Sequence, residues 1–230
     1  MEPKKPACAT CGIKERICLS PKGQGPTSCP TLHRKGSLKK ANKEYRKHDI
    51  LKFAREASVQ EGECYINRHT KPYISHPVKP RVQETCEFAR KMGYKKIGVA
   101  FCIGLHKEAL SLMQILKAQE FEVISVACKA GGTPKEDIGI KEEEKIHIGD
   151  FESMCNPIAQ AMILNDEKTD CNISVGLCVG HYMLFIKYVK GPLTVLTVKD
   201  RVRAHNPLGA VYAGFYFEKK LAGHKKNGRK

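Results

Sequence analysis

The chain has 230 residues, of which 41% are hydrophobic, so it can bury the core of one medium domain and is not disordered throughout. Forty Lys and Arg residues against 24 Asp and Glu residues give a net charge of +16, which attracts polyanions. The apolar runs are too short to cross a bilayer and the first ten residues lack a signal-peptide core, so we expect a cytoplasmic protein without membrane contact.

Eleven cysteines are many for a protein of a reducing compartment. We do not expect a disulfide framework there, which leaves metal ligands, reactive thiols and buried packing residues. Residues 1–36 are rich in Cys, Pro and Gly and show no regular period. They are expected to form a small Cys-rich knuckle that a bound metal orders.

Residues 37–80 are predicted to form a basic helix over 38–60 and an extended, Pro-rich connector over 65–80. Residues 1–55 hold 14 basic and 4 acidic residues, and the segment 218–230 is also basic. Such ends could bind nucleic acid. No aromatic-interleaved RNA motif and no DNA-binding module accompanies them, so a solvated surface explains the charge as well.

From residue 81 to 220, short apolar strands alternate with helical patterns. We expect helices over 81–92, 105–118, 156–165, 180–189 and 206–220, and strands over 96–101, 121–127, 172–177 and 193–198. This alternation is typical of a parallel sheet covered on both faces. The predicted fold is therefore α/β, a Rossmann-like open sheet of about four parallel strands with flanking helices, followed by a basic tail over 221–230.

The first cysteine constellation is Cys8-x2-Cys11-x6-Cys18-x10-Cys29. A Cys-x-x-Cys pair lets two thiolates reach one ion from a tight turn, and two later cysteines can complete a tetrahedral shell. Four thiolates suit either zinc or an iron–sulfur cluster. The spacing is neither that of a zinc ribbon nor that of a ferredoxin. We favour an iron–sulfur cluster, with zinc as the alternative.

The second constellation emerges once the strands are placed. Cys102, Cys128 and Cys178 each follow a predicted strand, and Cys155 directly precedes the Asn-Pro start of a helix. Ligands of doubly wound sheets bind outside the carboxyl ends of the strands, where helix N-termini favour thiolates. Four such cysteines could hold a 4Fe-4S cluster. The alternative is that they are small buried hydrophobes, which is a common role of cysteine.

Polar side chains are predicted at the same edge of the sheet. His181 and Asp200 are candidate catalytic groups, since a histidine there could donate a proton to a substrate. Lys129, Asn156 and His205 are candidate substrate-binding residues. Helix capping and turn formation are the plainer roles for these side chains. No Ser-His-Asp, Walker or GxGxxG pattern supports a hydrolase, an NTPase or a dinucleotide-binding protein.

Four strings, "FCIGL", "CNPIAQA", "VGLCVGH" and "TVLTVKDR", resemble an archaeal and bacterial family of predicted metal-binding proteins that carries the domain of unknown function 1847. The resemblance covers nearly the whole chain except the basic tail. It implies a metal-binding protein that occurs mainly in anaerobes and has no assigned reaction. It also implies an aliphatic residue at the position of Cys171, which agrees with placing Cys171 outside the site.

The leading hypothesis is an iron–sulfur protein of anaerobic metabolism with two four-cysteine sites. The N-terminal cluster would pass electrons, received from a redox partner protein, to a strand-end cluster that reduces a small molecule or transfers sulfur. One alternative is a non-enzymatic carrier or sensor of zinc or iron. Another is a zinc-stapled, basic nucleic-acid-binding protein. The sequence leaves open whether the protein is an enzyme.

Overall fold

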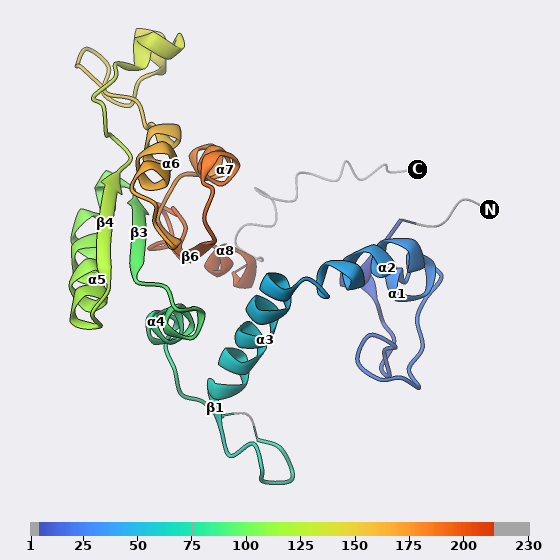
Figure 1. The fold of residues 1–230 in the computed structure, drawn as a ribbon. Coiled ribbons are helices and arrows are strands. Elements are labelled where there is room, and N and C mark those ends of the chain that lie inside the picture. The colour runs from blue at the N-terminus through green and yellow to red at the C-terminus, as the bar shows by residue number, and fades with distance from the viewer. Residues whose placement is uncertain (1–4, 75, 214–230) are drawn as a thin grey trace, which may run out of the picture. The chain divides into compact units, whose positions relative to one another are not determined.

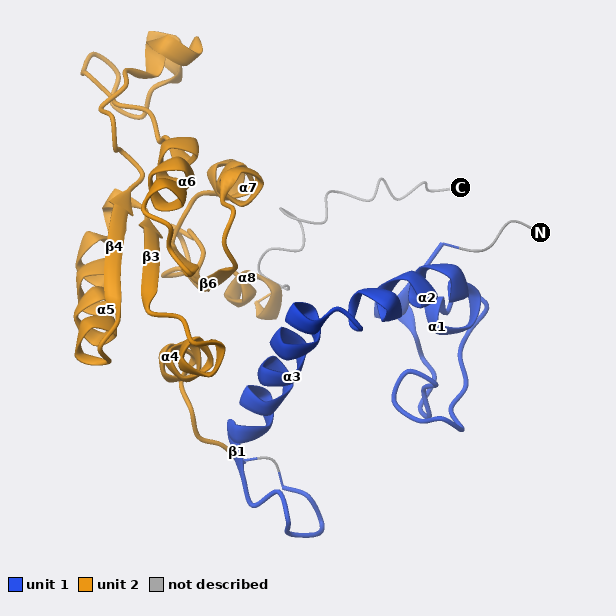
Figure 2. Ribbon diagram, in the orientation of Figure 1, with its two compact units in different colours: residues 1–76 blue, residues 77–230 orange. Residues whose placement is uncertain are grey.

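The computed structural model describes residues 5–74 and 76–213 and divides the chain into two compact units, residues 1–76 and 77–230 (Figure 2). The domain boundaries expected from the sequence are finer than this division and stay a prediction. No helix in the described part of the chain is long and apolar enough to cross a membrane.

The first unit is helical and thinly packed. Its elements are a 3-10 turn η1 (Cys8–Thr10), the helices α1 (Pro30–His33), α2 (Lys35–Glu44) and α3 (His48–Glu63), and the short strand β1 (Tyr65–Ile66), which pairs with β2 (His76–Pro77). Among its described residues only Gln60 is buried. The single helix expected over 38–60 is wrong, because an extended residue, Lys47 at ψ 134°, separates α2 from α3.

The second unit is built on a parallel sheet of four strands. They are β3 (Lys96–Phe101), β4 (Glu122–Ala127), β5 (Cys171–Val175) and β6 (Leu193–Thr197), in the spatial order β4-β3-β5-β6 (Figure 1). The expected α/β fold with four parallel strands is confirmed. The central strands β3 and β5 are almost wholly buried, as expected of a parallel sheet covered on both faces.

Helices precede, connect and follow these strands. They are α4 (Arg81–Met92), α5 (His106–Ala118), α6 (Pro157–Asp166), α7 (Val179–Tyr188) and α8 (Leu208–Tyr212), with 3-10 turns η2 (Ile103–Leu105), η3 (Lys135–Ile138) and η4 (Glu142–Glu144). Gly93 ends α4 in the left-handed conformation at φ +78°, where glycine carries no steric cost. The basic tail over 221–230 and residues 214–220 of the helix expected over 206–220 lie outside the described residues.

The strand order places a topological switch point between β3 and β5. The chain leaves β3 through α5 for β4 on one side, and then returns through α6 to β5 on the other side. With right-handed crossovers this reversal puts α5 on one face of the sheet and α6 with α7 on the other. Ligand crevices of open α/β sheets form at such a point, outside the carboxyl ends of the strands.

Candidate functional site

The four N-terminal cysteines surround one hollow of the first unit. Cys8, Cys11, Cys18 and Cys29 all line a cavity of about 110 Å³, which they share with Arg16. That volume exceeds the roughly 10–15 Å³ that a single water requires. Gly25 lies directly against Cys29, because a Cβ at this position would lie 2.9 Å from Cys29 Sγ.

Local hydrogen bonds favour the thiolate form of one of these cysteines. Desolvation opposes ionisation of Cys29, but the backbone N–H groups of Leu32 and Thr31 donate to its sulfur, and the net result is a lowered pKa. The thiolate is the form that binds metals. Cys29 is the N-cap residue of α1 and directly precedes Pro30.

Three strand-end cysteines form a hydrogen-bonded row at the carboxyl edge of the sheet. The Cys128 thiol lies between Cys102 and Cys155 and hydrogen-bonds to both. This arrangement lowers the pKa of Cys102 to about 5 and that of Cys155 to about 4, whereas it raises the pKa of Cys128. The row therefore consists of two thiolates that share a central thiol. The N–H of Ile103 also donates to Cys128 Sγ, at 3.4 Å.

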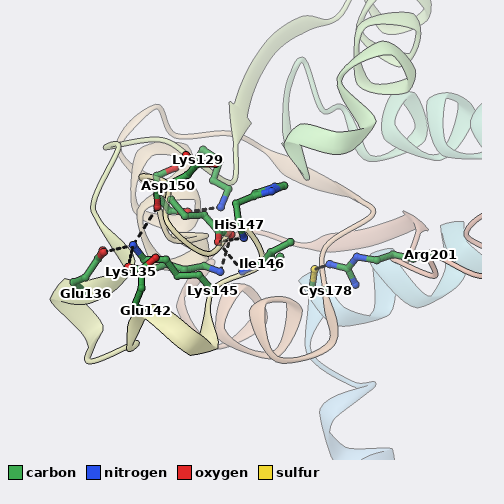
Figure 3. A network of polar contacts seen from close by, with 12 residues as sticks. Lys129, Lys135, Glu136, Glu142, Lys145, Ile146, His147, Asp150, Cys178 and Arg201 are labelled. Carbon is green, nitrogen blue, oxygen red and sulfur yellow. Dashed lines mark hydrogen bonds and ion pairs between the residues drawn. The ribbon is translucent and has the colours of Figure 1, made fainter.

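Each outer thiol of this edge has a cation beside it. Lys199 hydrogen-bonds to Cys102, and Lys129 acts on the charge of Cys155. Cys178 stands at the N-cap of α7, and its sulfur accepts a hydrogen bond of 3.2 Å from Arg201 Nη2 (Figure 3). Cations stabilise thiolates by direct Coulomb attraction.

His181 belongs to the same cluster. It lies in the first turn of α7 and hydrogen-bonds to Cys155, which helps to lower the pKa of that thiol. Its Nδ1 is buried and has no hydrogen-bond partner among the described residues. A buried nitrogen without a partner costs free energy, so His181 Nδ1 is available to a bound group.

The other predicted polar residues occupy capping and turn positions. Asn156 Oδ1 accepts the N–H of Ala159 at the start of α6, a typical N-cap bond. Asp200 accepts the N–H groups of Val202 and Arg203, and the Nδ1 of His205 accepts the N–H of Asp200. These bonds shape the loop after β6. A catalytic role of Asp200 and a substrate contact of Asn156 or His205 stay predictions.

A buried amide that was not predicted from the sequence bonds to the strand ends beside Cys102 and Cys128. Gln160 is fully buried in α6, and its Nε2 donates to the carbonyls of Phe101 and Val126 at 3.1 and 2.7 Å. These carbonyls lie at the ends of β3 and β4, one and two residues before Cys102 and Cys128. A glutamine within the apolar run "NPIAQAMILN" is the signal that could have revealed it. Lys199 was absent from the predicted site, and Arg201 was expected at this edge but without a role.

The remaining cysteines lie elsewhere. Cys171 starts β5 at the opposite end of the sheet, and burial raises its pKa to about 12. Burial also raises the pKa of Cys86, on α4. Cys64 Sγ donates to the carbonyl of Gln60. None of the three joins either constellation.

Neither constellation is a cage for one ion. Within residues 5–74 and 76–213, no three Cys, His, Asp or Glu side chains are arranged to hold a single metal ion. A four-iron cluster is wider than one ion and places its four thiolates further apart.

The fold and the two cysteine sets define an α/β protein with a Cys-rich N-terminal segment. The chain belongs to the family of proteins of unknown function DUF1847, whose model matches residues 29–196. It is 46% identical over 190 residues to the uncharacterized protein MJ0455 of Methanocaldococcus jannaschii, which covers 83% of this chain and 91% of the relative. No solved structure matches the chain. The family resemblance seen in the sequence is confirmed.

Proposed function

We propose that this protein binds iron–sulfur clusters through two cysteine sets and acts in redox or sulfur chemistry at the carboxyl edge of its sheet. The N-terminal set is Cys8, Cys11, Cys18 and Cys29. The strand-end set is Cys102, Cys128, Cys155 and Cys178. The observation that carries the proposal is the common hollow of the N-terminal set, because four thiols around one space are what a four-thiolate centre needs.

At the strand-end edge, the chain's own residues prepare a charged thiol site. Cys102 and Cys155 supply thiolates, and nearby cations offset the negative charge that accumulates there. His181 can hold or deliver a proton beside Cys155. A bound cluster would supply one-electron transfer at this edge, with the N-terminal centre as the electron donor.

Metal and sulfide analysis of protein purified without oxygen tests this function. We expect a brown protein with about eight iron atoms and a matching amount of sulfide per chain, four for each cluster. Electron paramagnetic resonance of the dithionite-reduced protein should then show a cluster signal. A colourless protein that contains zinc alone would overturn the proposal.

A metal carrier or sensor is the second candidate, and the exposure of two N-terminal cysteines favours it. Cys8 and Cys18 are exposed, so a chelator or an acceptor protein can reach their sulfurs. Such a protein should release its metal to a competing chelator within minutes and show no reducible centre. Slow release together with a redox signal would favour the iron–sulfur function over this one.

A further inference from the structure

A long loop leaves the strand-end edge between β4 and α6, and ion pairs make it stiff. Lys145 is the centre of its first half: the side chain is only 4% exposed, lies 2.7 Å from Glu142 and also pairs with Glu136. Its Nζ donates in addition to the carbonyl of Asp150 at 3.1 Å. Figure 3 shows these contacts converging on one lysine.

Glu152 anchors the second half of the loop. Its carboxylate lies 2.7 Å from Lys135 Nζ and accepts the N–H groups of Ile146 and His147. The loop is therefore a packed element whose outer surface has a defined shape. It begins directly after Cys128 and ends at Cys155.

The outer surface of this loop is both apolar and acidic. Four large apolar side chains point into solvent with exposures between 60% and 72%: Ile138, Ile146, Ile148 and Phe151. Residues 136–152 contain seven acidic and two basic residues, a net charge of −5 in a chain of +16. Several large apolar side chains exposed among charged ones on one short segment indicate an interaction surface. We call residues 135–153 the acidic loop.

Helices α2 and α3 have the complementary character. Every residue over 35–53 is exposed, and the segment 35–55 contains eight basic and two acidic residues, a net charge of +6. Five large apolar side chains are exposed on it: Leu38, Tyr45, Ile50, Leu51 and Phe53. Both surfaces leave apolar side chains in water, and their charges are opposite.

We propose that the acidic loop of one copy of this chain docks on helices α2 and α3 of a second copy. Opposite charges orient the two surfaces, and burial of the apolar side chains on both sides stabilises the contact. A reciprocal pair makes this contact twice and closes as a two-fold dimer. It brings the Cys-rich unit of one copy to the loop that joins Cys128 to Cys155 in the other. This inference goes beyond the proposed function and does not require a metal at the strand-end site.

Charge reversal tests the contact without disturbing the loop's interior. Asp137→Lys with Glu143→Lys reverses two exposed acidic residues that take no part in the Lys145 and Glu152 networks. Lys39→Glu with Lys43→Glu reverses two exposed residues of α2. The matched control is Asp166→Lys with Glu167→Lys, at the far end of α6. Each protein is purified free of nucleic acid and without oxygen, and its molecular mass in solution is measured by sedimentation velocity.

The wild type and the control should sediment at twice the 25.7 kDa of one chain, and raising the salt should shift them toward monomer. Each loop or helix variant alone should be monomeric. An equimolar mixture of the two should form a heterodimer, because one of its contacts joins two unaltered surfaces and the other faces the introduced lysines with the introduced glutamates. A wild type that stays monomeric would overturn the inference, and so would variants whose mixture does not associate. A contact between the two surfaces within one chain would give the first of these results.

Discussion

The two cysteine sets differ in what holds them in place. The N-terminal set lies on irregular loops of a unit in which Gln60 is the one buried residue among those described. The strand-end set lies at the edge of a sheet whose central strands are almost wholly buried, and Gln160 ties two of those strand ends together. The fold itself therefore holds the second set, whereas the first set has few buried neighbours to hold it.

Metal removal should produce the largest difference between the segments that carry the two cysteine sets. Chelation under reducing conditions is expected to unfold the N-terminal segment, because a metal-ordered knuckle has little other stabilisation. Backbone amides of Ile17 and Gln24, which hydrogen-bond in the folded segment, should then exchange with deuterium within seconds. Amides of β3 and β5 should keep their protection. Equal protection of both units after chelation would contradict the comparison.

Loss of the buried amide should weaken the strand-end set by destabilising its scaffold. Gln160→Ala removes the side-chain donor from the carbonyl of Val126 and one of the two donors from the carbonyl of Phe101, which also accepts the N–H of Cys128. We expect a loss of about 2–4 kcal/mol in the free energy of unfolding, measured by urea denaturation. Gln114→Ala, on the exposed face of α5, is the matched control and should change the stability by less than about 0.5 kcal/mol. Equal losses of unfolding free energy in the two variants would contradict a stabilising role of Gln160.

The reactivity of the Cys155 thiol tests the hydrogen-bonded row of Cys102, Cys128 and Cys155, with a smaller expected effect. In metal-free protein, Cys155 should react with iodoacetamide at a rate that hardly changes between pH 6 and 8, because its pKa of about 4 keeps it ionised throughout. An ordinary thiol, with a pKa near 8.5, reacts about tenfold faster per pH unit in this range. Site-resolved mass spectrometry gives both profiles. Cys128→Ala should restore a steep profile, and Cys86→Ala should not; a steep profile in the wild type would contradict the hydrogen-bonded row.

Acid should loosen the acidic loop over a defined range of pH. Lys135 and the N–H groups of Ile146 and His147 lower the pKa of Glu152 from 4.5 to about 2. Because the folded pKa is depressed, ionised Glu152 stabilises the loop above pH 4.5, and this contribution is lost as the pH falls toward 2. The amide signal of Ile146 in nuclear magnetic resonance spectra should titrate with a midpoint near 2. A midpoint near 4.5 would show that Glu152 is not held as described.

The sequence predicted the regular elements of the second unit because their signals are local. Apolar strand runs and the stop at Gly93 placed β3 and α4 at the bounds that the structure shows. The break at Lys47 has no such signal, since no Gly or Pro lies within residues 38–60.

The sequence predicted the cysteines of the candidate site, but it did not predict the cations that contact them. Strand-end positions placed Cys102 and Cys128 at one edge of the sheet, and the helix start at Asn156 placed Cys155 there too. The cation contacts of Lys199 and Arg201 depend on how the loop after β6 folds back over that edge, which no local pattern specifies. The same holds for Lys145, whose burial depends on two carboxylates from separate turns.

The most direct test of two separate cysteine centres is the iron and sulfide content of two single variants purified without oxygen. Cys11→Ala and Cys178→Ala should each lose about half of the iron, while Cys171→Ala, outside both sets, should keep all of it. Cys178→Ala should also retain the order of the N-terminal segment. Loss of all the iron in either of the first two variants, or full retention in both, would contradict the account.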